Sequence, residues 1–279
     1  MKKYLSLALA VYLFIGVSVL RLTRNDNLKI IACDVGQGDA ILLIYQSTQV
    51  LVDGGPNSKV LDCLSRHLPF WDRNLEIVVN THPEADHATG LIDVFERYKV
   101  DNFVKNTDVS GTQTYRLLEG AVKANGSRVV VNPEKLVVGK GVIQIDILSQ
   151  NTKRQMLKNE KLNLNSLVLL VKYREFEALL AADIEPPATE GVAEELKKIS
   201  IDWPIEYIKV PHHGSKNGLT QTLLETVKPK VAVISVGKNQ WGHPNTETLE
   251  LLNIYNTKIL RTDLLGDVVV KSDGKKWWY

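Results

Sequence analysis

Residues 81–87 combine imidazole and carboxylate side chains in a pattern typical of a metal-binding turn. The turn reads Thr-His-Pro-Glu-Ala-Asp-His and directly follows an apolar run. Imidazole nitrogen suits zinc and other transition metals, whereas carboxylate oxygen suits harder cations such as manganese. Because side chains alternate along an extended chain, His82, Glu84 and Asp86 are expected on one side, and His87 on the other unless the chain curls. This one segment could therefore serve two adjacent cations.

The remaining clustered histidines also follow apolar, strand-like runs. Five of the six histidines fall in three clusters, formed by the 81–87 turn, by His212 with His213, and by His243. His67 stands alone and is interpreted as an ordinary residue at a helix end. Loops at strand ends are where catalytic groups collect in layered α/β folds. The repetition indicates one site to which several loops contribute.

Asp183 ends the apolar run 176–182 and is a candidate to join this site. A carboxylate at the end of a buried strand needs a partner, or it incurs a large desolvation cost. A pair of cations bridged by Asp183 would supply that partner. The alternative is a helix cap, since aspartate caps helices well and a helical pattern begins near residue 188. Both interpretations stay open on the sequence alone.

The chain resembles a known family, the metallo-β-lactamase-fold hydrolase domain of the ComEC competence proteins. The likeness runs in order over about residues 29–279 and does not include the multi-helix membrane channel of full-length ComEC. The strings Asp-Val-Gly-Gln-Gly-Asp and His-His-Gly-Ser are its most specific parts. The segments that carry it are 34–40, 52–55, 81–90, 182–183, 211–215 and 242–244.

The resemblance implies an αββα sandwich of the α/β class, with a two-metal hydrolytic site at one edge. Alternating strand and helix patterns in the sequence agree with such a layered fold. No linker rich in glycine, serine or proline is present, so one domain is expected over 29–279. Strands are expected at 29–33, 40–45, 49–53, 75–80, 142–148, 166–173, 176–182, 205–210, 231–236, 258–261 and 267–271. Helices are expected at about 58–67, 88–98, 112–124, 188–199, 218–227 and 245–254.

The turn departs from the wider superfamily, which has His-x-His-x-Asp-His where this chain has Glu84. A further histidine expected between the turn and Asp183 is also missing. Asn165, in the best-placed segment, could be a weak ligand, a substrate contact or the polar start of a strand, and the last is preferred. Fewer imidazoles and one more carboxylate shift the preference from zinc towards manganese. One metal position could also be weakly occupied.

The resemblance also assigns roles to the candidate ligands. His82 and Glu84 would hold one metal, and His87 with His243 the other, bridged by Asp183. Asp86 would ligate a metal and orient the attacking water, whose pKa a divalent metal lowers. The expected cofactors are two divalent ions, manganese or zinc.

The His-His-Gly-Ser string leaves several assignments open. His213 is marginally favoured as the ligand, and His212 would then donate a proton or bind phosphate. Ser215 could act as a nucleophile, but a phosphate contact or a helix cap near Lys216 is preferred. Three lysines near the proposed loops could meet phosphates, although each is more often an ordinary surface residue; they are Lys209, Lys216 and Lys238.

The glycine-rich segment 34–40 lies between two strand patterns. Its glycines permit a tight turn with positive φ, and Asp34, Asp39 and Asp53 could brace the metal loop through hydrogen bonds. For the glycines, a plain hairpin is at least as strong an interpretation. The segment is not a dinucleotide fingerprint, because no helical pattern follows it.

Composition limits the choice of partner. The chain has 34 basic and 32 acidic residues, a net charge of +2 and 44% hydrophobic residues, as globular proteins do. No basic stripe typical of strong nucleic-acid binders is present, although bound cations would add local positive charge. The C-terminal aromatic residues 277–279 could stack on bases, but a closing edge strand is preferred.

Residues 1–28 read as a signal peptide or a membrane anchor. Lys2 and Lys3 precede the uncharged, mainly apolar stretch 4–20, expected to form a single hydrophobic helix. An uncleaved anchor is preferred, with the domain outside the cytoplasm in either case. Cys33 and Cys63 are interpreted as buried thiols rather than a disulfide framework, although export permits a bond between them.

The sequence and the resemblance together predict a metal-dependent hydrolase. The expected activity is that of a phosphodiesterase or nuclease on DNA, in a competence-related process at the membrane. The DNA substrate rests on the resemblance, because this fold hosts many chemistries. One alternative is hydrolysis of a small lactone, ester or β-lactam. The other is a catalytically inactive binding domain of a surface assembly, whose protein partners the sequence does not identify.

Overall fold

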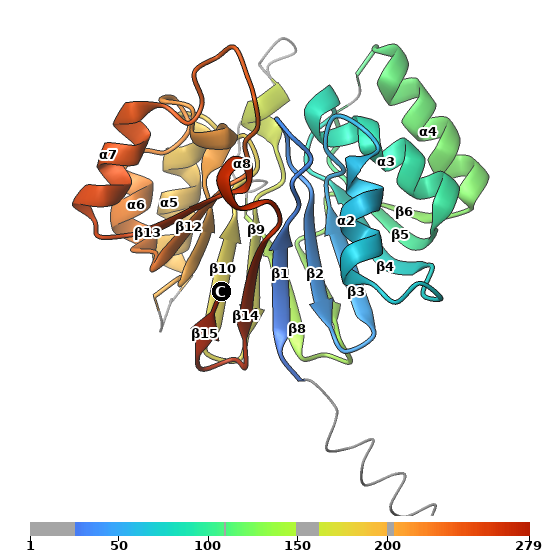
Figure 1. Cartoon of the computed structure of the whole chain (residues 1–279), viewed down its shortest axis with the longest axis horizontal. Helices are drawn as coiled ribbons and strands as arrows, with labels where there is room; N and C mark the ends of the chain where they lie inside the picture. Colours follow the sequence, from blue (N-terminus) through green and yellow to red (C-terminus); the bar gives the residue numbers. More distant parts are fainter. Residues whose placement is uncertain (1–25, 109, 149–161, 200–203) are drawn as a thin grey trace, which may run out of the picture.

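Two β-sheets pack face to face in the computed structural model, with helices on both outer faces (Figure 1). The structure describes residues 26–108, 110–148, 162–199 and 204–279. Strands and helices therefore form four layers, the αββα sandwich expected from the sequence.

The first sheet runs from the C-terminal strands through the N-terminal half of the chain. Its strands are antiparallel from β15 to β3 and parallel from β3 to β6. In spatial order they are β15 (Trp277–Trp278), β14 (Val268–Ser272), β1 (Leu28–Ala32), β2 (Ile41–Tyr45), β3 (Thr48–Val52), β4 (Asn74–Asn80), β5 (Lys99–Lys105) and β6 (Arg128–Val131).

The second sheet is built from the rest of the chain. Its strands are parallel from β13 to β10 and antiparallel from β10 to β7. In spatial order they are β13 (Lys258–Arg261), β12 (Val231–Ile234), β11 (Tyr207–Lys209), β10 (Phe176–Leu180), β9 (Leu169–Tyr173), β8 (Ile143–Ile147) and β7 (Lys135–Val138).

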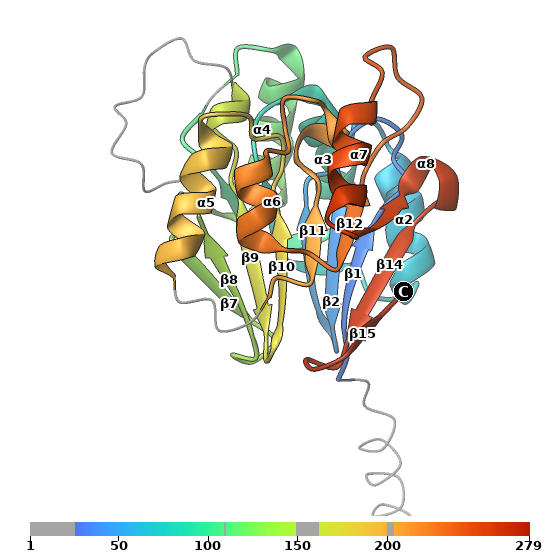
Figure 2. The same ribbon diagram turned by 90° about the vertical axis from the view of Figure 1, so that its left-hand side faces the viewer.

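Each sheet carries its own outer layer of helices, as the two views show (Figures 1 and 2). The helices on the first sheet are α2 (Lys59–His67), α3 (Ala85–Arg97) and α4 (Gln113–Asn125). Those on the second are α5 (Ala188–Lys198), α6 (Gln221–Val227) and α7 (Thr246–Ile254). The short elements are η1 (Leu162–Asn165), η2 (Pro211–Gly214) and α8 (Thr262–Leu265).

Alternation along the strands divides the buried side chains between the layers. In β1, Ile30 belongs to the core between the sheets and Ile31 to the core beneath α2 and α3. In β11, Tyr207 faces the first sheet and Ile208 faces the outer helices. Strands covered on both faces are apolar at every position, as the central strands here are.

Most of the expected elements are present, and the differences have local causes. β5, β6 and β7 were not expected, because charged or exposed side chains interrupt their apolar pattern. At the C-terminus, Trp277 and Trp278 form the edge strand β15, which was preferred over a base-stacking role. Asn165 does not open a strand as preferred; it ends η1, and β9 begins four residues later at Leu169.

The interpretation of the two cysteines as thiols is wrong. Cys33, just beyond β1, and Cys63, in α2, form a disulfide with their Cα atoms 5.8 Å apart. Both residues are buried, so strand and helix are joined inside one core.

The predicted leader or anchor, 1–28, lies outside the described residues except for its last three. Leu28 opens β1. Within the part of the chain that the structure describes, no helix is long and apolar enough to cross a membrane.

Candidate metal centre

The turn after β4 curls into a helix instead of remaining extended. Glu84 is the N-cap of α3, whose backbone begins with the His87 and Ala88 N–H groups donating to the Glu84 carbonyl. Asp86 and His87 therefore lie in the first helical turn, so simple alternation does not describe the whole 82–87 segment. A carboxylate in this position is also favoured by the positive end of the helix dipole.

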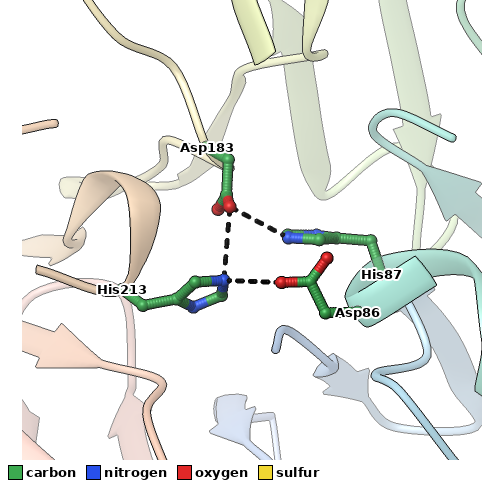
Figure 3. A group of neighbouring side chains, drawn as sticks. All are labelled: Asp86, His87, Asp183 and His213. Atoms are coloured by element: carbon green, nitrogen blue, oxygen red, sulfur yellow. Dashed lines mark ion pairs between the residues drawn. The ribbon is translucent and has the colours of Figure 1, made fainter. Parts of the chain in front are cut away.

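Four side chains from both halves of the molecule meet at one point (Figure 3). Asp183 Oδ2 lies 3.3 Å from His87 Nε2 and 3.2 Å from His213 Nε2. His213 Nε2 also lies 3.4 Å from Asp86 Oδ2. One ligand atom from each of the four lies within 4.8 Å of all the others, a separation suited to a shared metal ion.

The free nitrogen atoms of the histidines show that this group fits a metal. The Nε2 atoms of His82, His87 and His213 are buried without a hydrogen-bond partner among the described residues. On the other side of each ring, His87 Nδ1 contacts Asp53 at 2.8 Å and His213 Nδ1 contacts the Ser235 carbonyl at 2.8 Å. Such contacts fix the tautomer that offers the Nε2 lone pair to a metal. The four-residue group can therefore hold a divalent cation.

Asp53 braces this arrangement, as the sequence suggested. Besides His87, its carboxylate accepts hydrogen bonds from the Thr81 N–H at 2.8 Å and the Thr81 hydroxyl at 2.6 Å. Helix α3 packs closely on the loop that follows: a Cβ atom on Gly90 would lie 2.0 Å from the Gly54 carbonyl oxygen. Only glycine permits this approach, which holds the first turn of α3 against Asp53.

Lys209 is a central residue of the site and not the surface lysine that was expected. It is fully buried, and its Nζ donates to the Ala182 carbonyl at 2.9 Å and to Asp183 Oδ1 at 3.3 Å. Its ammonium also forms an ion pair with Asp39. Lys209 thus occupies one oxygen of Asp183 and leaves Oδ2 to face the histidines. Its place at the end of a buried strand, three residues before a histidine pair, was the signal in the sequence.

The other two aspartates of the expected brace differ from each other. Asp39 is buried, with Oδ1 3.5 Å from His213 Nδ1 and its backbone N–H donating to the Asp86 carbonyl. Asp34 does not contact the metal loop. Its carboxylate accepts from the Gly36 N–H, and its own N–H donates to Asp267, so it stabilises its own turn.

Buried opposite charges set the protonation of this group. Burial opposes the charged form of His213, but Asp183 and Asp39 outweigh it and raise its pKa to about 9. Burial likewise opposes charge on His87, yet Asp183, Asp53 and Asp86 raise its pKa well above the ordinary value. Burial opposes the charged form of Asp183, but His213, His87 and Lys209 outweigh it and hold its pKa well below the usual range. Without metal, imidazolium–carboxylate pairs take the place of the cation.

His82 and Glu84 form a second group beside the first. His82 Nε2 lies 3.9 Å from Glu84 Oε2, and the His82 and His87 ring centroids are 4.1 Å apart. Burial, reinforced by the neighbouring His87 charge, lowers the pKa of His82 well below its ordinary value, so it stays neutral. A neutral imidazole beside a half-buried carboxylate is a suitable partial ligand set.

His212 and His243 lie together, on the other side of Asp183. Their ring centroids are 5.5 Å apart, and His212 Nε2 is 3.9 Å from Asp183 Oδ2. His212 Nδ1 contacts Glu185 at 2.9 Å, a partner that the sequence reading had not assigned. The structure therefore groups His243 with His212, whereas the sequence grouped it with His87, and it places His213 in the four-residue group instead.

The backbone of η2 explains how adjacent histidines reach different partners. His212, His213 and Gly214 all have positive φ, of 48°, 53° and 80°. Such conformations are unfavourable for residues with a Cβ, and they cluster at functional sites. The unusual path turns one imidazole towards Asp86 and the other towards Glu185.

Three further candidates lie outside these groups. The Ser215 hydroxyl accepts from the Asn217 N–H at 3.3 Å and so stabilises its own turn, but no helix begins there, so it is not the N-cap considered from the sequence. Asn165 donates to Asp108 at 3.3 Å. Lys216 is exposed. The structure gives none of the three a contact with the four-residue group.

No protein-family model matches this chain. Two curated proteins are similar in sequence. ComE operon protein 3 of Bacillus subtilis is 26% identical over an alignment that covers 84% of this chain and 32% of the relative. Recombination protein 2 of Haemophilus influenzae is 27% identical over an alignment that covers 85% of this chain and 28% of the relative. The chain thus spans about a third of the length of these relatives.

Solved structures show the same fold at low sequence identity. The metallo-β-lactamase fold protein YhfI from Bacillus subtilis has a TM-score of 0.58 at 11% identity, covering 89% of this chain and 100% of its own. Igni18, a metallo hydrolase from Ignicoccus hospitalis, has a TM-score of 0.56 at 12% identity, and the match covers 87% of this chain and 98% of Igni18. These likenesses concern the fold alone.

Proposed function

This chain is a ComEC-like protein of the metallo-β-lactamase fold, and from that premise we propose that it is a metal-dependent nuclease or phosphodiesterase acting on DNA. The observation that carries the proposal is the convergence of Asp86, His87, Asp183 and His213, in which the buried Nε2 atoms of both imidazoles face carboxylates and have no hydrogen-bond partner among the described residues. Such a group has no use in a purely structural core, where buried polar atoms are paired.

The donor set determines which cofactor we propose. A divalent cation bound here supplies charge neutralisation at the phosphate and activation of the attacking water. We propose two divalent ions, of manganese or zinc. The four-residue group would hold one, and His82 with Glu84 would hold the other. The carboxylate in place of a histidine favours the harder manganese at the second position.

The protein's own side chains supply positioning and proton transfer. Asp86 is 31% exposed at its side chain, so it can orient a water molecule on the side open to substrate. His212 is 23% exposed, and Glu185 holds its Nδ1, which leaves Nε2 directed to the site. We assign His212 as the proton donor to the leaving oxygen when the phosphorus–oxygen bond breaks.

Three similar proteins support DNA, a phosphodiester, as the substrate. The curated relatives bear the names ComE operon protein 3 and Recombination protein 2, which support a role in competence-related DNA processing. One structural neighbour is described as a diphosphatase from the PhnP family, with a TM-score of 0.50 at 14% identity. It supports phosphate-ester chemistry on this scaffold.

The disulfide supports a location outside the cytoplasm. Disulfides persist in oxidising compartments and are rare in the cytosol. The bond between Cys33 and Cys63 thus agrees with the proposed export, with the N-terminal segment as a membrane anchor or signal peptide.

The test is cleavage of single-stranded and duplex DNA by the purified chain with manganese, magnesium or zinc. Asp86→Asn should abolish cleavage, whereas Asp93→Asn, a matched change on the same helix, should leave it intact. Absence of cleavage with every metal, together with no metal retained on purification, would sink the enzymatic proposal. Cleavage of a chromogenic lactone or β-lactam but not of DNA would favour a small-molecule hydrolase.

A further inference from the structure

Trp241 lies on the loop between β12 and α7 that also carries His243. This loop projects from the end of the molecule in Figure 2. Trp241 is 63% exposed. A single exposed tryptophan does not by itself indicate a function. Whether Trp241 has one is therefore judged from its position and from how firmly its loop is held.

The loop holds Trp241 in one place through the side chain of Asn239. The Asn239 amide donates to the carbonyls of Gly237 at 2.9 Å and His243 at 2.8 Å. Its oxygen accepts from the N–H groups of Trp241 at 3.1 Å and His243 at 3.0 Å. The indole is therefore presented by an ordered backbone, so a ligand would find it already positioned.

A row of rings connects Trp241 to the metal centre. The Trp241 and His243 ring centroids are 6.4 Å apart, and the planes are inclined by 33°. His243 is 5.5 Å from His212, whose Nε2 is 3.9 Å from Asp183 Oδ2. Trp241 is thus the outermost ring of a series that begins beside Asp183 of the metal centre.

We propose that Trp241 is the stacking platform for an unpaired nucleobase next to the scissile phosphate. In a nucleotide the base is separated from its phosphate by one sugar, which matches an exposed ring placed beside the metal centre rather than within it. Any of the four bases can stack on an aromatic ring, because every base has a π face. This inference rests on the proposed nuclease function and deepens it: the substrate is single-stranded or frayed DNA, read without base preference.

The test measures binding rather than cleavage. A labelled thymidine oligonucleotide and the same oligonucleotide with abasic tetrahydrofuran sites are titrated by fluorescence anisotropy with the full chain, in chelator so that no cleavage occurs. The native chain should bind the base-bearing strand about 5- to 100-fold more tightly than the abasic strand. Trp241→Ala should remove that difference, and Trp241→Phe should keep most of it.

Trp71 provides the matched control. It is 72% exposed and precedes β4, at the end of that strand opposite the 81–87 turn. Trp71→Ala should leave the affinity ratio unchanged. Equal affinity of the native chain for both strands would overturn the inference, as would an undiminished ratio in Trp241→Ala. Loss of the same ratio in Trp71→Ala would also overturn it, because stacking would not be specific to this loop.

Cleavage of the same two strands with metal then separates the two proposals. A Trp241-dependent affinity ratio without any cleavage would contradict the nuclease and keep the stacking platform. Cleavage of both strands with KM unaffected by Trp241→Ala would contradict the platform and keep the nuclease.

Discussion

Single residues determine which histidine atoms are available to a metal. Asp53 contacts His87 Nδ1, and the Ser235 carbonyl contacts His213 Nδ1, so both rings present Nε2 to Asp183. These outer partners matter because the tautomer and angle of a ligating imidazole decide its affinity for the metal. The carboxylate of Asp53 thus contributes to the metal affinity of the site without being a ligand.

Replacing Asp53 should weaken metal binding without removing any ligand. Asp53→Asn keeps the shape but loses the charged acceptor of His87 Nδ1, and we expect manganese or zinc affinity to fall about 10- to 100-fold. Titration calorimetry checks this. The control is Asp34→Asn, since the hydrogen bonds of Asp34 within the described residues are to its own turn and to Asp267; an equal loss there would contradict the bracing role of Asp53.

Lys209 is the fixed positive charge of the site. With Lys209 removed, the buried carboxylates of Asp39 and Asp183 would lose the ammonium that pairs with both, so Lys209→Met should destabilise the metal-free protein by about 3–5 kcal/mol. Urea unfolding in chelator measures the loss. The double variant Asp39→Asn with Lys209→Met should recover part of it, because one of the two stranded charges is gone.

Exposed Lys216 gives the comparison for that experiment. Lys216→Met should change the free energy of unfolding by no more than about 0.5 kcal/mol. If the double variant were no more stable than Lys209→Met alone, the electrostatic explanation would be wrong.

At the scale of elements, the ends of strands and helices place the ligands. Helix α3 begins at Ala85, so its first turn carries Asp86 and His87, while the left-handed path of η2 carries His212 and His213. Helix α2 contributes no ligand, but its bond to Cys33 anchors it beside the 34–40 turn. That turn supplies Asp39 to the site.

The disulfide should contribute to stability through the chain that it closes. Cys33 and Cys63 are 30 residues apart, and a loop of that length predicts a loss of about 3–4 kcal/mol on reduction. Urea unfolding with and without reductant measures it. In the double variant Cys33→Ala with Cys63→Ala, reductant should have no effect; a reductant effect there would mean that the disulfide is not its cause.

At the scale of the whole molecule, the metal centre joins the two halves of the sandwich. Asp86 and His87 follow β4 of the first sheet, whereas Asp183 and His213 follow β10 and β11 of the second. A metal bound by all four would therefore stabilise the packing of one sheet on the other. Ligand binding to the folded state alone adds stability, about 2.7 kcal/mol at one hundred times the dissociation constant.

The stabilisation of the folded protein by a bound metal should increase with pH. In the metal-free protein, the pKa of His213 is raised from 6.5 to about 9. Its protonated form therefore adds stability that is complete below pH 6.5 and is lost as the pH rises through about 9. A metal needs the neutral imidazole, so its affinity should rise over the same interval.

Unfolding with manganese and with chelator, from pH 6.5 to 9, measures the effect. We expect the stabilisation by metal to grow with pH as the metal-free protein loses stability. Parallel curves with and without metal would show that His213 does not exchange a proton for the metal.

The sequence determined the fold class and indicated most of the residues that meet at the metal centre, because both depend on local patterns. Apolar runs alternating with helical periodicity specify layers, and ligand-type residues at the ends of those runs mark the metal centre. Strand β5 was not predicted, because its charged side chains break the apolar pattern of a strand. It forms nevertheless, because it is paired with β4 and β6.

Only the tertiary structure decided which candidates meet. The grouping of His213 with His87, and of His243 with His212, depends on how two sheets pack and on a left-handed backbone that residue types do not reveal. The burial of Lys209 and the pairing of Cys33 with Cys63 likewise join residues far apart in the chain. Spacing along a sequence specifies an element, but distances between elements arise only when their apolar faces pack together.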